Sequence, residues 1–235
     1  MPYLKVNLLF IILFTGNVFT QVLRTQEISK EVKYPISIIG SEDDDVNFCD
    51  PILVHFDELS KHLFILEGLN HRVTILDTNL FFIRHFGNFG QGSSEFNRPL
   101  SLDTDNKGNI IIQDLNKRIQ VFNPNFEQIS NFNHKFVPMN LSCENDGNIL
   151  LNSGSSGKLF TILDYEGDFV NSFGDLMLKK DNSHLYNGYN QVYFEIDYNG
   201  DIYCAFTYNA VFRKYNRYFN MVYEMNYDDL EMIQN

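Results

Sequence analysis

The feature that most constrains the fold of this chain is a segment that repeats itself. The stretch Pro99–Phe122 (PLSLDTDNKGNIIIQDLNKRIQVF) is repeated at Pro138–Leu163 (PMNLSCENDGNILLNSGSSGKLFTIL). Looser copies occur at Pro51–Leu76 and at Val192–Tyr215. A repeat of roughly 40–50 residues is typical of solenoids, propellers and related arrays. Repetition therefore constrains the architecture before any local motif is considered.

Each repeat divides into four short strands. In the second repeat we expect them at Leu100–Thr104, Ile110–Gln113, Arg118–Phe122 and Gln128–Phe132. Runs rich in Ile, Val and Phe are bounded by Asn, Asp, Gly and Pro, which is the pattern of strands joined by tight turns. Four consecutive antiparallel strands form one blade of a β-propeller. The sequence therefore predicts an all-β propeller in which about four blades are visible.

The repeats also predict where the blades begin and end. We expect blades at 48–87, 96–132, 136–174 and 190–226, preceded by a linker at 21–33 and followed by an acidic tail at 227–235. Residues 34–40 (YPISIIG) resemble a further outer strand that has no blade of its own. In a propeller such a strand completes the last blade and closes the ring.

The motifs of the second repeat resemble those of the NHL repeat. They are a glycine-rich loop, EFxxP (from Glu95), a DxxGNI turn (from Asp105) and RIQVF (from Arg118). The order of the repeats is similar to that of secreted six-bladed propeller proteins of bacteria, over the range Tyr34–Asn226. The resemblance implies an NHL-type propeller. Some NHL-like propellers are metal-dependent lyases, with histidines around the central channel.

The number of repeats departs from that family. A six-bladed ring needs roughly 260 residues at this period, and the chain has 235. The chain is therefore a truncated relative, or a second chain completes it, or its ring closes with fewer blades. We favour an incomplete six-bladed ring or an open arc. Exposed strand edges at the ends of such an arc would promote self-association.

The N-terminus has the pattern of a secretory signal peptide. Lys5 supplies a positive charge, and Val6–Phe14 is apolar apart from Asn7. This run is well short of the ~20 residues that a membrane helix needs, and it matches the apolar part of a signal peptide. We expect residues 1–20 to be removed and the product to be secreted or to stay in the periplasm or cell envelope. Contact with a membrane is expected only if the segment is not cleaved.

Charge and cysteine content restrict the partners. The net charge of −12 argues against nucleic acid, because the phosphates would be repelled. The three cysteines, Cys49, Cys143 and Cys204, show no CxxC spacing and indicate neither a disulfide framework nor a zinc site. The run from Asp103 to Gly108 starts like a calcium loop but lacks the terminal Glu, so we interpret it as a turn. We predict no cofactor, and calcium and zinc stay as unsupported alternatives.

Catalytic motifs are not supported by the sequence. The six histidines are scattered, and His55 alone lies on an expected innermost strand. No nucleophile elbow or HExxH motif is present. The main prediction is a secreted, non-catalytic binding or scaffold module. The alternatives are a metal-dependent propeller lyase or lactone hydrolase, and a truncated propeller without independent function.

The expected binding surface is the face where the blade-to-blade connections meet the turns between second and third strands, here called the loop face. We predict that it contacts a protein, a peptide or a saccharide, because tyrosines with a few polar groups make an adaptable surface. The candidate residues are His71, Arg72, Asn97, Arg98, Asp114, Lys117, Arg118, Tyr189, Tyr193 and Tyr208.

Several of these candidates have a structural alternative. Arg72 and Arg118 occupy equivalent positions in two repeats, and an acidic residue precedes each of them (Glu67 and Asp114). Repeated arginine–carboxylate pairs suit the planar guanidinium. For Tyr193 and Tyr208, the structural alternative is that their side chains pack between blades.

Overall fold

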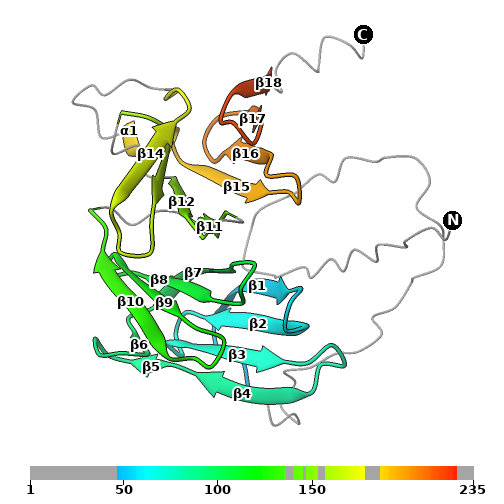
Figure 1. Ribbon diagram of the computed structural model, residues 1–235, viewed down its shortest axis with the longest axis vertical. Helices are drawn as coiled ribbons and strands as arrows, with labels where there is room; N and C mark the ends of the chain where they lie inside the picture. The colour runs from blue at the N-terminus through cyan, green and yellow to red at the C-terminus, as the bar shows by residue number, and fades with distance from the viewer. Residues whose placement is uncertain (1–46, 136–139, 145–146, 153–156, 178–185, 227–235) are drawn as a thin grey trace, which may run out of the picture. The chain divides into compact units, whose positions relative to one another are not determined.

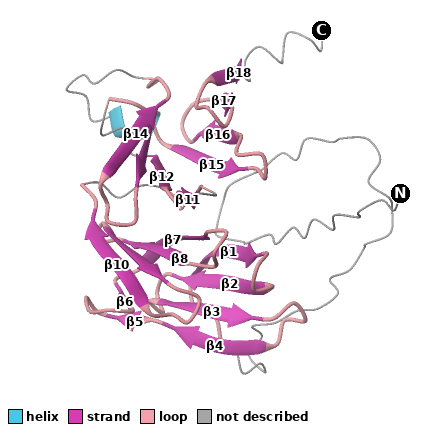
Figure 2. Ribbon diagram, in the orientation of Figure 1, coloured by secondary structure: helices cyan, strands magenta, loops and turns pink. Residues whose placement is uncertain are grey.

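The computed structural model describes residues 47–135, 140–144, 147–152, 157–177 and 186–226. The chain divides into two compact units, Met1–Asn47 and Phe48–Asn235, and the second contains all the elements below. The expected signal peptide, linker, additional outer strand and acidic tail lie outside the described residues. Figure 2 shows that the regular elements of the described part are strands, apart from one short helix.

Sixteen of the strands form four antiparallel sheets of four strands each. Blade 1 contains β1 (Pro51–Asp57), β2 (His62–Glu67), β3 (Arg72–Leu76) and β4 (Phe82–Phe86); blade 2 contains β7 (Pro99–Thr104), β8 (Ile110–Asp114), β9 (Arg118–Phe122) and β10 (Gln128–Asn133). Blade 3 contains β11 (Leu141–Cys143), β12 (Ile149–Asn152), β13 (Phe160–Leu163) and β14 (Phe169–Phe173); blade 4 contains β15 (Val192–Ile196), β16 (Ile202–Phe206), β17 (Val211–Tyr215) and β18 (Met221–Asn226). The connection between blades 1 and 2 carries a short parallel pair, β5 (Asn88–Phe89) and β6 (Glu95–Phe96), and the one described helix, α1 (Tyr186–Tyr189), precedes blade 4.

The fold class predicted from the repeats is confirmed. Within each sheet the strands pair in chain order, as in a propeller blade (Figure 1). In the second blade every strand begins and ends within one residue of the expected position. Four blades are described, so a six-bladed ring remains a hypothesis.

The turns at the ends of strands use one recurrent device. Asp105 accepts hydrogen bonds at its Oδ1 from the backbone N–H groups of Lys107 and Asn109, both at 2.8 Å, and Gly108 adopts a positive φ of 78°. The short polar side chain thus accepts hydrogen bonds from backbone N–H groups of the turn, and this stabilises the reversal of the chain. The run expected to be a turn rather than a calcium loop is therefore a turn. The same pattern of acceptance recurs at Asp77, Asn123, Asp164, Asp197 and Asn216.

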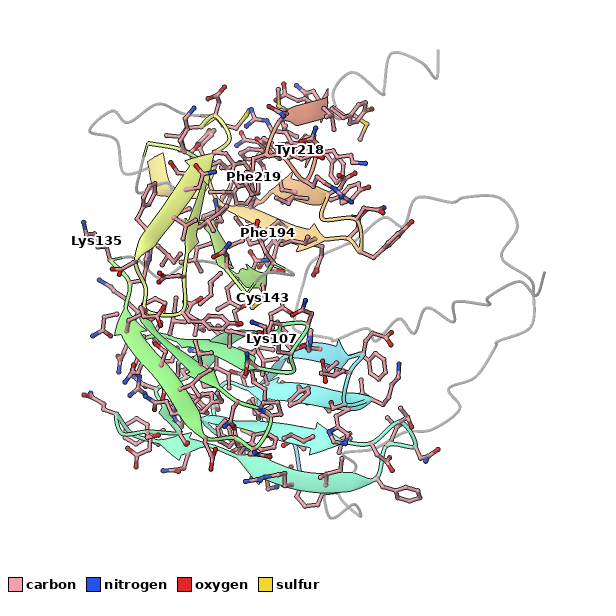
Figure 3. The ribbon with its side chains drawn as sticks, viewed as in Figure 1. Lys107, Lys135, Cys143, Phe194, Tyr218 and Phe219 are labelled. Atoms are coloured by element: carbon pink, nitrogen blue, oxygen red, sulfur yellow. The ribbon has the colours of Figure 1, made fainter. Side chains whose placement is uncertain are left out.

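The core consists of three clusters, each between two successive blades. One joins blades 1 and 2 around Phe86 and Phe122, one joins blades 2 and 3 around Ile119, and one joins blades 3 and 4 around Phe160 and Phe194. Figure 3 shows Phe194 within the dense side chains of this third cluster. None of these clusters contains described residues from both blade 1 and blade 4. Each blade is therefore stabilised mainly by its neighbours in the chain, as in other repeat architectures.

Candidate functional site

The loop face of blades 1 and 2 is built from two turns and one connection. The turns are 68–71, between β2 and β3, and 115–117, between β8 and β9; the connection is 87–98. The backbone N–H of Arg98 donates to His71 Nδ1 at 2.8 Å, and that of Leu115 donates to the carbonyl oxygen of Asn97 at 3.0 Å. The structure therefore brings four predicted residues together here: His71, Asn97, Arg98 and Lys117.

Two other predicted residues, Asp114 and Arg118, are buried beneath this surface. Arg118 Nη2 lies 3.1 Å from Asp114 Oδ2. The same guanidinium donates to the carbonyl oxygens of Gln91 at 2.5 Å and Gly92 at 3.3 Å, and also to that of Glu95. Arg118 therefore holds the glycine-rich connection against blade 2. Its ligand role remains a prediction.

The expected arginine–carboxylate pairing is confirmed in both repeats. In blade 1 Arg72 Nε donates to Glu67 Oε1 at 2.8 Å. The fully buried Glu67 also accepts from Asn70 Nδ2 at 2.7 Å, from the backbone N–H of Cys49 at 2.9 Å, and from the hydroxyl of Thr74. Burial raises the pKa of Glu67, but the hydrogen bonds from Arg72, Thr74, Cys49 and Asn70 outweigh it and hold the pKa below its ordinary value.

This lowered pKa predicts an acid-sensitive contribution to stability. Because the folded-state pKa of Glu67 lies below the ordinary value of 4.5, its stabilisation is present above that pH and is lost as the pH falls through the folded-state pKa. We expect Glu67→Gln to lower the free energy of unfolding by about 1–3 kcal/mol at neutral pH. The deficit should shrink as the solution is acidified. Denaturant titrations across the acidic range measure it.

The control for this experiment is Glu58→Gln. The Glu58 side chain is largely exposed and pairs with Lys61 at the surface, so its removal should change stability little at any pH. An equal deficit for Glu67→Gln at neutral and acidic pH would contradict the assignment.

Exposed side chains of the loop face, together with the half-buried His71, form a surface of mixed character, here called the basic–apolar patch. Three exposed apolar residues belong to it: Leu69 (57 % exposed), Phe89 (67 %) and Leu115 (46 %). The other members are His71, Arg98 and Lys117. The rings of His71 and Phe89 lie 4.9 Å apart.

The exposed charged members of the patch are cations, although the protein as a whole is acidic. Glu67 and Asp114 are buried and paired with arginines, whereas Arg98 and Lys117 are exposed. Asp50 lies 3.4 Å from Arg98 and offsets part of this charge. Glu95, in the same connection, is a second carboxylate near these cations. The chain carries a net charge of −12, so Arg98 and Lys117 are exposed cations on an acidic protein.

The backbone of these turns does not by itself mark a binding site. His71, Arg98 and Lys117 have φ values of 54°, 52° and 67°, in the left-handed region that non-glycine residues rarely adopt. Phe126 and Phe219, at the other ends of their blades, have φ values of 66° and 63°. The conformation is therefore a general property of the turns in this protein.

The predicted tyrosines separate into two places. Tyr189 and Tyr208 lie close together on the loop face of blade 4, where Asn209 Nδ2 donates to the carbonyl oxygen of Tyr189 at 3.0 Å. Tyr193 lies on β15, paired with Ala205 on β16, on the face of blade 4 that points away from blade 3. It is therefore placed on a sheet face rather than among the loops.

A hollow lies at the ends of blades 1 and 2 that are opposite to the loop face. Its volume is about 420 Å³, and it lies between the β1–β2 and β7–β8 turns. The lining residues are His55, Phe56, Asp57, Glu58, Leu59, Thr104, Asp105 and Asn106. His55 Nε2 lies 2.7 Å from Thr104 Oγ1, which donates to Asp57 Oδ1 at 3.0 Å. These groups mostly satisfy one another.

The described part of the chain contains no cluster of metal ligands, and burial protects two of its three thiols. In those residues no three His, Cys, Asp or Glu side chains are grouped so that they could hold a metal ion. Burial raises the pKa of Cys143 well above its ordinary value and that of Cys204 to about 12, which disfavours the nucleophilic thiolate. No described helix is long and apolar enough to cross a membrane.

Three members of the patch were missed by sequence reasoning: Leu69, Phe89 and Leu115. Leu69 and Leu115 occupy turns otherwise made of Gly, Asn, His and Lys. Apolar side chains at such positions were a usable signal, because turns favour small polar residues.

Comparisons with solved structures agree with the propeller fold. A putative exported protein from Bacteroides fragilis matches with a TM-score of 0.60 and 18% identity, over 81% of this chain and 54% of that one. The Cps50 (Swd1) β-propeller domain of Myceliophteria thermophila matches with a TM-score of 0.52 and 10% identity, over 77% of this chain and 56% of that one. Virginiamycin B lyase from Staphylococcus aureus matches with a TM-score of 0.53 and 8% identity, over 74% of this chain and 54% of that one.

These similarities concern the fold alone. The chain spans about half the length of the proteins that it matches. Comparison with models of known families and with curated protein sequences finds no match. The chain is thus an all-β propeller with four described blades, similar in fold to a putative exported protein of Bacteroides fragilis and to other propellers.

Proposed function

We propose that this chain is a secreted, NHL-type binding module whose loop face holds an acidic segment of a protein or peptide. The observation that carries the proposal is the basic–apolar patch. Arg98 and Lys117 offer cationic donors, and Leu69, Phe89 and Leu115 offer apolar area beside them. The fold similarity to a putative exported protein and the signal-like N-terminus support secretion.

The composition of the patch favours a peptide over a saccharide. Two of its three large apolar members, Leu69 and Leu115, are aliphatic and give no flat ring on which a sugar could stack. They suit an apolar side chain, and interfaces gain most of their affinity from such anchors. Arg98 and Lys117 suit carboxylates next to that anchor. The expected ligand is therefore a segment with an apolar residue flanked by Asp or Glu.

A randomised peptide display library provides the test. Peptides are selected on the wild-type chain and counter-selected on Leu69→Asp/Leu115→Asp, and the winners are synthesised and titrated by calorimetry. We expect acidic peptides with one large apolar residue. Arg98→Ala should weaken their binding by about ten-fold, equivalent to about 1.4 kcal/mol, and added salt should weaken it further.

The matched control is Arg217→Ala. Arg217 is an exposed arginine between β17 and β18, away from the loop face, so its loss should leave peptide binding unchanged. If both substitutions weaken binding equally, attraction is non-specific. If selection yields no common motif, the peptide-binding proposal is wrong.

A further inference from the structure

Blade 4 has one face that no described blade covers. Its first face, with Phe194, Cys204 and Tyr215, is buried against blade 3. The strand register places the opposite side chains in two rows across the sheet, which we call the outer face. The first row is Tyr193, Ala205, Phe212 and Met225, and the second is Glu195, Tyr203, Lys214 and Tyr223.

The outer face is rich in aromatic side chains, and several of them remain in solvent. Tyr193 is 57% exposed and Tyr223 is 52% exposed, and Phe212 is half-buried. In blade 2 the residues that point toward the next blade include Ile111 and Ile119, and both are fully buried by blade 3. The corresponding surface of blade 4 therefore has the composition of an interface without a described partner.

Contacts within the blade fix the positions of several side chains on the outer face. Lys214 Nζ lies 2.7 Å from Asp201 Oδ2 and 4.8 Å from the centre of the Tyr203 ring. The rings of Tyr203 and Phe212 lie 6.3 Å apart. The hydrogen bond to Asp201 raises the pKa of Lys214 above its ordinary value, so this lysine stays charged at physiological pH. The face thus presents a positioned cation among aromatic rings.

We propose that the outer face of blade 4 binds the outer face of a second copy of this chain, forming a dimer with two-fold symmetry. The two-fold axis lies between the stacked sheets, parallel to the strands and between β16 and β17. It places β16 of each copy over β17 of the other, and β15 over β18.

The strand register of blade 4 makes this arrangement self-complementary. Ala205 of one copy faces Phe212 of the other, so a small side chain leaves room for a large one. Tyr203 faces Lys214, whose ammonium already lies over the Tyr203 ring of its own copy, so the ring of the second copy adds a further cation–aromatic contact. Because an isologous interface contains every contact twice, both pairs occur twice.

The edges of the face match in the same way. The axis sets Glu195 of one copy opposite Tyr223 of the other, where a phenolic hydroxyl can donate to the carboxylate. It sets Tyr193 opposite Met225, a favourable aromatic–sulfur pair. A two-fold axis perpendicular to the strands would instead oppose the two rows, placing Phe212 on Lys214 and Tyr193 on Glu195. That alternative still sets Ala205 opposite a large side chain, Tyr203, but it removes the ammonium of Lys214 from the Tyr203 ring of the second copy and places it on Phe212.

The proposed dimer does not depend on peptide binding. The basic–apolar patch lies on blades 1 and 2, and the outer face lies on blade 4. Each proposal can therefore fail while the other holds.

Sedimentation velocity of the full chain over a range of concentrations tests the dimer. We expect a reversible dimer, and we expect Phe212→Lys and, separately, Ala205→Glu to weaken association by at least ten-fold. Ala205 is exposed, so its variant should fold even if the Phe212 variant does not; thermal melting checks both. Tyr198→Lys, on an exposed turn outside the face, is the control and should stay dimeric.

Chemical cross-linking tests the axis itself. Cys49 is exposed, so it is first replaced by Ser. Copies carrying Ala205→Cys are then mixed with copies carrying Phe212→Cys and treated with a bis-maleimide that spans about 10 Å, the distance between packed sheets. Mixed cross-linked dimers are expected. A chain that is monomeric at every concentration, or a dimer unaffected by both substitutions, or the absence of mixed cross-links, overturns the proposal.

Discussion

Replacing Arg118 by alanine is expected to lower the free energy of unfolding by about 3–5 kcal/mol, the cost of leaving one partner of a buried ion pair uncompensated. The substitution removes the charged partner of Asp114, which is almost completely buried and keeps only hydrogen bonds from backbone N–H groups. It also removes the donors that hold the carbonyl oxygens of Gln91, Gly92 and Glu95. Denaturant unfolding measures the loss, and hydrogen exchange should show a larger effect in the 87–98 connection than in blade 4.

Two further substitutions separate charge from geometry. Arg118→Lys keeps the charge but not the planar fork that reaches several carbonyl groups, so its stability should fall between those of wild type and Arg118→Ala. Arg98→Ala removes an exposed arginine paired with Asp50, and should cost less than about 1 kcal/mol. Equal losses for Arg118→Ala and Arg98→Ala would show that the buried clamp does not stabilise the fold.

Replacing Phe160 by alanine should produce a loss of similar size, about 3–5 kcal/mol, through a cavity between blades 3 and 4. Phe160 is fully buried. Its ring stacks on Phe173 at 4.9 Å and meets Phe194 edge-on at 5.1 Å. Phe169→Ala is the control: its side chain is exposed on the neighbouring strand β14, so the variant should be almost as stable as wild type.

The location of the effect is as informative as its size. Because the three core clusters are separate, Phe160→Ala should reduce amide protection in β15 and β16 well before it does so in β2 and β3. Stability in repeat proteins is approximately a sum of nearest-neighbour terms, which is the reason for this expectation. A uniform loss of protection across all four blades would contradict it and would indicate one cooperative core.

Side chains alternate between the two faces of a strand, and this alternation explains which residues of the candidate site could be placed from the sequence and which could not. The turn positions of His71, Arg98 and Lys117 follow from strand boundaries alone, and the structure places these residues together. Tyr193 was grouped with them, but it is the second residue of β15, and pairing with β16 turns its side chain onto the outer face. A shift of one residue in register exchanges the two faces of a strand.

Some contacts have no signature in the sequence. The pair formed by Asp114 and Arg118 was predictable, because the two residues lie four apart across one turn. The carbonyl oxygens of Gly90 and Glu95 lie 28 and 23 residues from Arg118, respectively. Their contact with the guanidinium depends on how blade 1 is joined to blade 2, and backbone carbonyl groups are the same in every residue.

The sequence by itself determined the repeat, the four-stranded blade and the positions of the turns, because these depend on alternation of apolar residues and on the local chemistry of Asp, Asn and Gly. Only the tertiary structure decided which charges are buried and which apolar side chains remain outside. Glu67 and Asp114 are buried in ion pairs with arginines, whereas Arg98 stays exposed, so the acidic chain presents exposed cations on its loop face. In the same way, the arrangement of the blades leaves the outer face of blade 4 exposed to solvent and covers the corresponding faces of blades 2 and 3. The solvent exposure of a side chain depends on its neighbours in space and not on its residue type alone.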